Sequence, residues 1–206
     1  RPQVFAAAVA AGSPVHFLAE QARCEERGET WDLVTRRGVV AGLPAAPATP
    51  AAWGRRNAAL ALLCWQELAA AGTVRFPADP AAALAGAFLP ARFQRVLTAP
   101  DWVFDTAHNT EALLAALDAY LERPPAGRRW LLFGSLREKS LDPAVGERLR
   151  RCDRVVAAPV GLPRSRTEAE LAALFAGWGW SGAGAPAILP DLGAAIARLA
   201  AAAATA

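Results

Sequence analysis

Short apolar segments and helical segments alternate along the second half of the chain, and this alternation constrains the fold more than any other feature. The expected strands cover residues 95–97, 102–105, 130–133, 155–158 and 187–189, and the expected helices cover residues 110–121, 143–150, 168–176 and 194–203. Strands that alternate with helices through short loops are typical of a parallel sheet covered by helices on both faces. The pattern therefore predicts an α/β fold with a Rossmann-like doubly wound sheet. Because the pattern ends on a helix, we expect the last strand of this domain to be missing.

The first part of the chain has a less regular pattern. The elements expected there are a helix that Gly12 ends, strands over residues 15–18 and 31–37 with a charged loop between them, and a long helix over residues 55–71. The connection over residues 41–54 has too many prolines for a helix or a central strand. We expect one unit over residues 1–76, a linker over residues 77–92 and the Rossmann-like domain over residues 93–206.

Composition sets limits on function. The chain has 206 residues, of which 54% are hydrophobic and 20% charged, and its formal net charge is +3. Its arginines form no basic stripe with interleaved aromatic residues, which argues against nucleic-acid binding. No run of about eighteen strongly apolar residues is present, so no membrane span is expected. The three cysteines are odd in number and lack metal-ligand spacing, which favours a reducing compartment.

The stretch "DTAHN", residues 105–109, gathers polar side chains at the end of an expected strand. In an open α/β sheet, ligands bind outside the carboxyl ends of the strands, where loops lead into helix N-termini. Asp105 could accept the two hydroxyls of a ribose, and Asn109 or Thr110 could cap a helix whose free N–H groups favour anions. The alternative is an ordinary strand-end aspartate followed by a helix cap. On this chemistry alone the alternative is favoured, because helix caps are far more common than nucleotide sites.

Three further residues are candidates for a nucleotide site. Arg92, after the expected linker, could give bidentate contacts to a phosphate. Asn57, near the start of the long helix, could both donate to and accept from an adenine edge. Lys139 lies in the stretch "LLFGSLREKS" and could meet an acidic group. Each has an ordinary alternative, as a solvated linker arginine, a surface asparagine and an exposed loop charge respectively.

Two local features have structural explanations. Gly134, at the end of an apolar strand, permits close approach of another backbone. Thr167 and Glu170 have the spacing of a capping box at a helix start, which accounts for most of the stretch that contains Arg164 and Arg166 without any function.

The order of these segments is more specific than any one of them. The stretches "RRNAALALL", "LPARFQRV", "VFDTAHNTEALLAAL", "LLFGSLREKS" and "APVGLPRSRTEAEL" follow one another as in the C-terminal half of folylpolyglutamate synthase/dihydrofolate synthase, and the chain resembles this family of the Mur ligase superfamily over nearly its whole length. The resemblance implies an ATP-dependent amide ligase, a cytoplasmic monomer that acts on small molecules and not on nucleic acid or membranes. ATP, with Mg²⁺, would phosphorylate a folate or dihydropteroate carboxylate, and the amine of L-glutamate would then displace phosphate.

The resemblance also implies roles for individual residues. Asn57 would contact the adenine, Arg92 the phosphates and Asp105 the ribose. His108 and Asn109 complete the same motif near the nucleotide. No catalytic residue is firmly implied, although His108 and the matching loop lysine would lie toward the interface between domains.

Several positions depart from the family pattern. Ala91 stands where the family has a glycine before Arg-Phe, and Thr106 and Thr110 stand where its aspartate motif has a glycine and a proline. Lys139 matches the family's loop lysine, but Ser140 replaces the acid that follows it. The missing acid leaves the choice of substrate open.

The family's phosphate-binding loop, its magnesium-binding acids and its modified lysine have no counterpart in this sequence. The resemblance implies that they belong to an N-terminal part, and that residues 1–76 are only the tail of the central ATPase domain. Phosphoryl transfer depends on a cradle for the phosphates and Mg²⁺. We therefore expect this chain alone to be inactive, and the metal ligands to lie in the missing part.

Two alternatives remain open. The chain could belong to a Mur-type ligase that acts on peptidoglycan precursors, although the spelling "DTAHNTEA" argues against it. It could also be a non-catalytic nucleotide-binding remnant of the family. A dinucleotide oxidoreductase ranks last, because no Gly-x-Gly-x-x-Gly stretch follows a strand.

Overall fold

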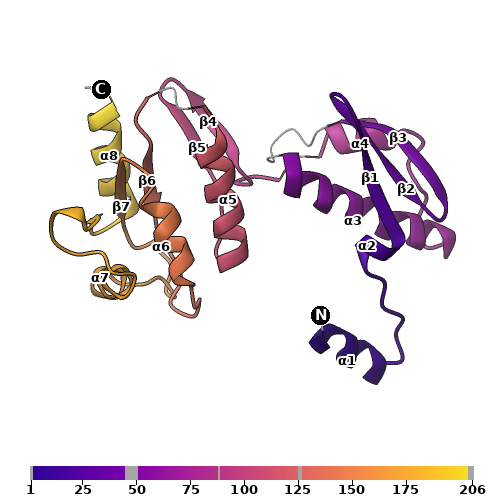
Figure 1. Ribbon diagram of the computed structural model, residues 1–206, viewed down its shortest axis with the longest axis horizontal. Helices are drawn as coiled ribbons and strands as arrows, with labels where there is room; N and C mark the ends of the chain where they lie inside the picture. The colour runs from indigo at the N-terminus through magenta and orange to yellow at the C-terminus, as the bar shows by residue number, and fades with distance from the viewer. Residues whose placement is uncertain (1, 45–50, 88, 125–126, 204–206) are drawn as a thin grey trace. The chain divides into compact units, whose positions relative to one another are not determined.

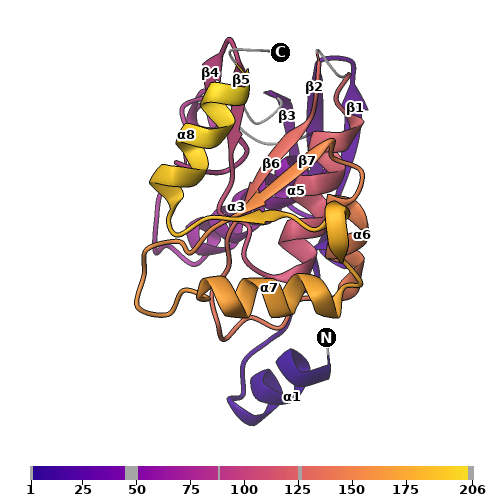
Figure 2. The same ribbon diagram turned by 90° about the vertical axis from the view of Figure 1, so that its left-hand side faces the viewer.

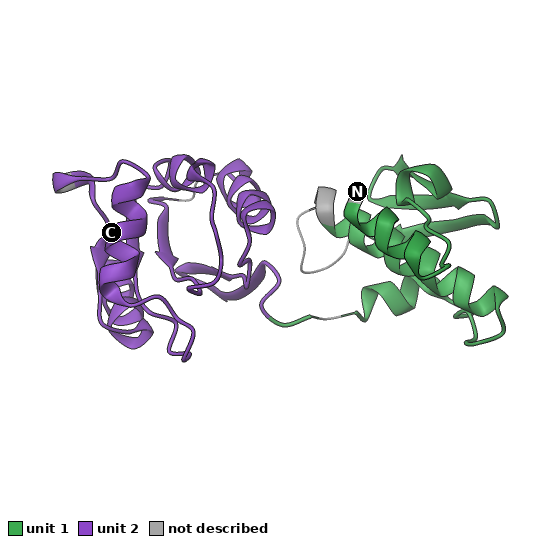
Figure 3. Cartoon of the chain, turned by 90° about the horizontal axis from the view of Figure 1, so that it is seen from below, with its two compact units in different colours: residues 1–90 green, residues 91–206 purple. Residues whose placement is uncertain are grey.

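The chain divides into two compact units, Arg1–Pro90 and Ala91–Ala206 (Figure 3). The computed structural model describes residues 2–44, 51–87, 89–124 and 127–203. The boundary between the units falls at Pro90, near the end of the segment in which a linker was expected. Helix α4 (Pro80–Ala85), in the middle of that segment, contacts strand β3 (Gly38–Pro44) of the first unit.

The first unit is built on a three-stranded antiparallel sheet. Helices α1 (Pro2–Ala10) and α2 (Leu18–Gln21) come first, followed by the strands in the order β1 (Ala22–Arg27), β2 (Thr30–Thr35) and β3 (Gly38–Pro44), which is also their order in the sheet. The long helix α3 (Ala51–Ala70) runs beside this sheet (Figure 1). Alternate residues of β2, Trp31 and Leu33, are buried together with Leu43 of β3 and Ala59 of α3, and they form the core of the unit.

The expected strand over residues 15–18 is wrong. Residues 13–17 lie outside helices and strands, and α2 begins at Leu18. A stretch of four residues with three apolar side chains does not by itself distinguish a strand from the residues that lead into a helix. The connection expected over residues 41–54 is also partly wrong, because β3 extends to Pro44 and α3 begins at Ala51, while residues 45–50 lie outside the described part.

Strand β1 occupies most of the segment in which a charged loop was expected. Its charges pair along the strand and with β2: Arg23 with Glu25 at 2.8 Å, and Arg27 with Asp32 at 3.0 Å. β1 is an edge of the sheet, and charged side chains on an edge strand prevent further strand pairing. The same charges made the segment resemble a loop in the sequence.

The second unit contains the expected parallel sheet. Its strands are β6 (Trp130–Phe133), β7 (Arg154–Ala157) and β8 (Ala187–Ile188), in the order β6-β7-β8. Helix α5 (Thr110–Glu122) precedes the sheet, α6 (Pro143–Leu149) and α7 (Glu168–Gly177) connect its strands, and a short 3-10 turn η1 (Gly182–Gly184) and α8 (Leu192–Ala203) complete the unit.

Helices cover both faces of this sheet, as the alternation of elements predicts (Figure 2). Val155 and Ala157 of β7 are buried in a core that includes residues of α5, α6 and α7. Val156 and Ala158 point the other way and are buried against Ala195 of α8. A strand buried on both faces explains the continuous apolar run "VVAA".

Strands β4 (Gln94–Thr98) and β5 (Asp101–Phe104) form an antiparallel hairpin rather than part of the parallel sheet. This corrects the expectation for residues 95–97 and 102–105. Only Ala99 and Pro100, joined by a cis peptide bond, separate the two strands, and a parallel pairing needs a crossover of a dozen or more residues. Asp101 ties the hairpin to α5, since it accepts from Arg95 at 2.7 Å and from Arg123 at 2.6 Å.

In the described part of the chain, no helix has both the length and the apolar character that a bilayer crossing requires.

Candidate functional site

Asp105 lies directly after β5, and both of its carboxylate oxygens accept backbone N–H groups. Oδ2 accepts from Phe93 at 2.6 Å, and Oδ1 accepts from Ala107 at 2.6 Å. The side chain is half-buried. Each oxygen keeps a second lone pair, so two neighbouring hydroxyls could still bind to this carboxylate.

The residues that enter the second unit, Ala91–Phe93, form a tight turn beside Asp105. Ala91 has φ 56° and Phe93 has φ 48°, a left-handed conformation that costs about 1–2 kcal/mol for a residue other than glycine. The carbonyl oxygen of Ala91 accepts from the backbone N–H of Thr106 at 2.9 Å and from its hydroxyl at 3.1 Å. The N–H of Ala91 donates to the Gln94 side chain at 2.9 Å. The turn is therefore held by side chains at both of its ends.

Arg92 lies at the centre of this turn. Its side chain is half-buried, and among the described residues it has no hydrogen bond or ion pair. A guanidinium in that state is a cation that remains available to a phosphate or a carboxylate.

Asn109 caps helix α5, as the sequence predicts. Its Oδ1 accepts from the N–H of Ala112 at 2.8 Å. Thr110 does not share that role, because its hydroxyl accepts from the N–H of Asp142 at 3.1 Å. Asp142 in turn caps α6 through the N–H of Ala144 at 2.8 Å. The N-termini of α5 and α6 are thus joined by one side chain–backbone bond.

His108 is exposed between Asp105 and the cap of α5. Its Nδ1 lies 3.0 Å from the carbonyl oxygen of Thr106. For that contact to be a hydrogen bond Nδ1 carries the proton, and in the neutral ring Nε2 is then an acceptor.

Lys139 lies in the loop between β6 and α6, which the Thr110–Asp142 bond brings to the start of α5. The expected acidic partner is not found in the described part of the chain, where Lys139 forms no side-chain bond. The acid beside it, Glu138, pairs with Arg164 at 2.8 Å instead.

This loop is held against the loop that follows β7. Arg166 donates to the hydroxyl of the buried Ser135 at 3.1 Å and to the carbonyl oxygen of Lys139 at 2.8 Å. A Cβ at Gly134 would collide with Cγ1 of Val160 and lie 2.9 Å from the carbonyl oxygen of Ala158, so the predicted close approach is confirmed. The capping box of Thr167 and Glu170 is confirmed too.

Asn57 belongs to the first unit and lies apart from this set along the chain. Because α3 begins at Ala51, Asn57 lies in the second turn of the helix rather than at its start, and its side chain is exposed. No hydrogen bond of this side chain is found in the described part.

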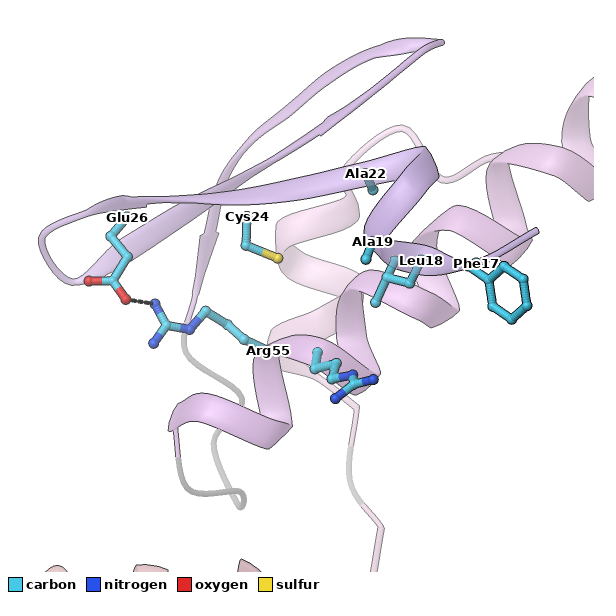
Figure 4. Close-up of a pocket in the computed structure, with 8 residues that line it drawn as sticks. Phe17, Leu18, Ala19, Ala22, Cys24, Glu26 and Arg55 are labelled. Carbon is cyan, nitrogen blue, oxygen red and sulfur yellow. Dashed lines mark hydrogen bonds and ion pairs between the residues drawn. The ribbon is translucent and has the colours of Figure 1, made fainter. Parts of the chain in front are cut away.

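A cavity of about 750 Å³ opens on the same helix, between α2, β1 and α3 (Figure 4). Arg55 forms one wall and pairs with Glu26 at 2.6 Å. Partial burial raises the pKa of the Cys24 thiol above its ordinary value, by more than the Arg55 guanidinium lowers it. The lining residues do not include Asn57; they are Phe17, Leu18, Ala19, Ala22, Cys24, Glu26, Arg55 and Arg56.

Each sequence-predicted site residue can now be placed. The structure gathers Arg92, Asp105, His108 and Asn109 into one unit, and links the loop of Lys139 to them through α5. It does not link Asn57 to the others. Sequence reasoning assigned no role to Gln94 or Asp142, which hold the turn and the helix start. The signal at Asp142 was local, an aspartate directly before Pro143 at a helix start, whereas the bond of Gln94 depends on the left-handed turn.

The described residues do not suit a metal ion by themselves, because nowhere do three or more His, Cys, Asp or Glu side chains gather in a way that could hold one. No chemical step is therefore assigned to Mg²⁺ through this part of the chain. A polyphosphate fits the set better, since Arg92 supplies an unpaired cation and α5 offers N–H groups at its N-terminus. Glu111, in the first turn of α5, opposes an anion there.

Comparison with known families gives one match. The model described as "Mur ligase, glutamate ligase domain" matches residues 91–206, which is the whole of the second unit. No curated protein sequence matches the chain.

Among solved structures, the chain is similar to Escherichia coli FolC in complex with ADP, without folate substrate, at 24% identity and a TM-score of 0.74 over 96% of this chain and 44% of that one. It is similar to Mycobacterium tuberculosis folylpolyglutamate synthase complexed with ADP and AMPPCP, at 21% identity and a TM-score of 0.74 over 98% and 46% of the two chains. A bifunctional folylpolyglutamate synthase/dihydrofolate synthase from Yersinia pestis, complexed with AMPPNP and Mn ion, is 24% identical with a TM-score of 0.66 over 94% and 43%. The chain spans less than half the length of each of these proteins.

Proposed function

Since the chain belongs to the Mur ligase family, whose glutamate ligase domain covers residues 91–206, we propose that it is the C-terminal part of an ATP-dependent ligase of the folylpolyglutamate synthase type. The ligase joins L-glutamate to a folate or dihydropteroate carboxylate in the cytoplasm. The match over the whole second unit carries this proposal, and the similarity of both units to ligase structures supports it.

In the proposed reaction, ATP phosphorylates the substrate carboxylate and the glutamate amine displaces the phosphate. Arg92 binds the polyphosphate with its unpaired guanidinium. Asp105 accepts the ribose hydroxyls on the lone pairs that its two N–H bonds leave free. Asn57 contacts the adenine. His108 and Asn109, beside Asp105, lie near the nucleotide. Lys139, without an acidic partner in the described part, orients a carboxylate of a substrate.

The proposal requires a phosphate cradle and metal ligands that the described residues do not form. The native polypeptide should therefore be larger than the 21.6 kDa of this chain, or act with a second chain. Intact mass spectrometry of the protein from its source decides between these two arrangements.

The activity is tested on the native polypeptide. Release of phosphate from ATP should require both L-glutamate and a reduced folate or dihydropteroate, and the folate product should gain the mass of one glutamyl residue. No such release with either pteridine substrate would reject the proposal. Release only with a UDP-linked peptide would assign the protein to peptidoglycan-precursor synthesis instead.

The site assignment has its own test. Arg92→Ala should weaken ATP binding by about tenfold or more, as expected for loss of a charge-assisted contact. Arg95→Ala is the matched control, because Arg95 lies three residues away and is already paired with Asp101. Asp105→Ala should weaken ATP but have a smaller effect on 2′,3′-dideoxy-ATP, which lacks the ribose hydroxyls. An equal effect on both nucleotides would remove the ribose contact from the proposal.

A further inference from the structure

The carboxylate of Asp105 also binds two backbone N–H groups of the chain itself, and these contacts do not involve a ribose. Its Oδ2 binds the N–H of Phe93, twelve residues earlier in the chain, at 2.6 Å. Its Oδ1 binds the N–H of Ala107, which fixes the carboxylate on its own loop at 2.6 Å. Both bonds have the short length of charge-assisted hydrogen bonds. One aspartate thus ties the loop after β5 to the turn before β4.

That turn contains two residues in a conformation that their side chains disfavour. Ala91 and Phe93 both have positive φ, at 56° and 48°, and they flank Arg92 on both sides. Such residues persist only where surrounding bonds hold them. The bonds here come from Asp105 at Phe93 and from the N–H and hydroxyl of Thr106 at Ala91. The local sequence therefore does not fix the direction of Arg92, and the loop after β5 does.

The influence of Asp105 on Arg92 is exerted through the backbone and not through a charge pair. Among the described residues, Arg92 forms no ion pair with any carboxylate. The carboxylate at the other end of the hairpin, Asp101, is occupied by Arg95 and Arg123 at 2.7 and 2.6 Å. Asp105 thus fixes the position of the cation without neutralising it.

We propose that Asp105 is the positioning residue for Arg92: its carboxylate holds the left-handed turn that presents the guanidinium, in addition to the ribose contact assigned above. This inference rests on the proposed function for the role of Arg92 with phosphate. It adds that recognition of the ribose and recognition of the phosphates are coupled through one carboxylate. A nucleotide without its ribose hydroxyls leaves this second role of Asp105 intact.

The turn is tested on this chain without any ligand. Trypsin cleaves after Arg92 only when the turn opens into an extended segment, and mass spectrometry identifies cleavage of the Arg92–Phe93 bond. The chain contains a matched internal standard, because Arg75–Phe76 is the same dipeptide outside helices and strands in the first unit. The ratio of cleavage at the two bonds removes differences in protease activity, and a urea unfolding curve of each variant shows that the second unit is folded under the conditions of the digest.

We expect Asp105→Ala to raise the cleavage ratio by about tenfold, the change expected for loss of a hydrogen bond to a charged group. Asp105→Asn keeps one carbonyl oxygen for one of the two N–H groups and should give an intermediate ratio. Asp101→Asn removes a negative charge from the same hairpin and should leave the ratio within about twofold of the wild type. A ratio that is the same in Asp105→Ala and the wild type overturns the proposal.

The link to Arg92 is tested with inorganic tripolyphosphate, which has no ribose, on the native polypeptide. Arg92→Ala should weaken the binding of tripolyphosphate by about tenfold when it is introduced into the wild type or into Asp101→Asn. When it is introduced into Asp105→Ala, it should weaken this binding by less than about twofold. An equal, tenfold effect of Arg92→Ala in all three backgrounds overturns the positioning role and leaves the proposed function standing. A wild type that binds neither ATP nor tripolyphosphate rejects the proposed function, while the cleavage ratio still decides whether Asp105 holds the turn.

Discussion

Ala91 has a backbone conformation that is unfavourable for alanine and is held by bonds from neighbouring residues. Its φ of 56° lies in the region that glycine adopts most readily, and glycine stands at this position in the family that the chain resembles. The alanine is kept in place by Gln94 on one side and by Thr106 on the other, through bonds of 2.9 to 3.1 Å. The sequence alone therefore shows an unusual residue in a motif, and the structure shows what compensates for it.

Ala91→Gly should stabilise the second unit by about 0.5–1 kcal/mol. Relief of the left-handed strain exceeds the greater entropy that glycine gives the unfolded chain. Ala185→Gly is the control, because Ala185 has φ −67° and gains no relief, so this variant should be destabilised by about 0.4–1 kcal/mol. Urea unfolding of both variants measures whether each substitution raises or lowers the free energy of unfolding. A loss of stability for Ala91→Gly would contradict the strain argument.

Asn109 separates a structural role from a ligand role. Asn109→Ala should cost about 1 kcal/mol of stability, because the N–H of Ala112 loses its acceptor. Asn109→Asp keeps the cap and should retain the stability. If a polyphosphate binds near the start of α5, as proposed, the added negative charge of Asn109→Asp should still weaken the binding of ATP. Urea unfolding and ATP titration give the two results independently, and unchanged ATP affinity for Asn109→Asp would place the phosphates elsewhere.

Two local features were predicted correctly at the residue scale, and contacts between distant positions were not predicted. Asn109 and the Thr167–Glu170 capping box were predicted because each acts within four residues of itself. The bond from Asp105 to Phe93 spans twelve residues and depends on the antiparallel pairing of β4 with β5. That pairing was not predicted, so the second role of Asp105 could not be predicted either.

At the scale of elements, the strand and helix bounds of the second unit follow the sequence closely where apolar residues pack on both faces of a strand. β6 was expected over residues 130–133 and lies at Trp130–Phe133. β1 was missed, because a charged edge strand and a charged loop have the same composition. The antiparallel pairing of β4 with β5 was not predicted. The apolar content of the two segments was considered, but the short connection between them, which rules out a parallel crossover, was not.

Gly134 tests how closely the loops at the carboxyl end of the sheet are packed. Gly134→Ala should destabilise the second unit by about 1–3 kcal/mol, because its Cβ would collide with Val160 and with the backbone at Ala158. Gly177→Ala is the matched control: nothing lies within 4 Å of its added Cβ, and alanine favours the helix. Thermal or urea unfolding distinguishes the two. Equal behaviour of both variants would show that the loops move apart at little cost.

At the scale of the whole molecule, each unit has its own core, and the sequence predicts them unequally. The second unit was recognised as α/β from its alternating pattern. In the first unit, the antiparallel sheet was only partly visible, because one strand resembles a loop and another contains the first proline of the Pro/Ala connection. Its cohesion also depends on ion pairs that link distant segments: Glu67 of α3 binds Arg37 at 2.7 Å and Arg36 at 3.2 Å, both at the turn between β2 and β3.

These ion pairs predict how the folded chain responds to acid. The hydrogen bond from Arg37, together with the bond and charge of Arg36, lowers the pKa of Glu67 from 4.5 to about 2. A carboxylate whose pKa is lower in the folded than in the unfolded state stabilises the folded state at any pH above its unfolded pKa. This stabilisation is lost as the pH falls through the folded pKa. The contribution should be complete above about pH 5 and should disappear below about pH 2.

Glu67→Gln should therefore be less stable than the wild type at neutral pH, and the two should converge as the pH approaches 2. Urea unfolding at a series of pH values measures this difference. In a chain that already carries Arg36→Gln and Arg37→Gln, the Glu67→Gln substitution should have no such pH-dependent effect. A constant difference at every pH would show that the carboxylate contributes nothing through its charge.

The bond between Thr110 and the N–H of Asp142 has an evolutionary consequence. The hydroxyl at position 110 serves the start of α6, thirty-two residues away, and not its own helix. Proline, which stands at this position in the family pattern, has no hydroxyl to offer. A lineage that exchanges threonine for proline there must supply the amide of residue 142 with another acceptor or leave it to water. Positions 110 and 142 should therefore covary among descendants of this protein, although neither needs to touch a substrate.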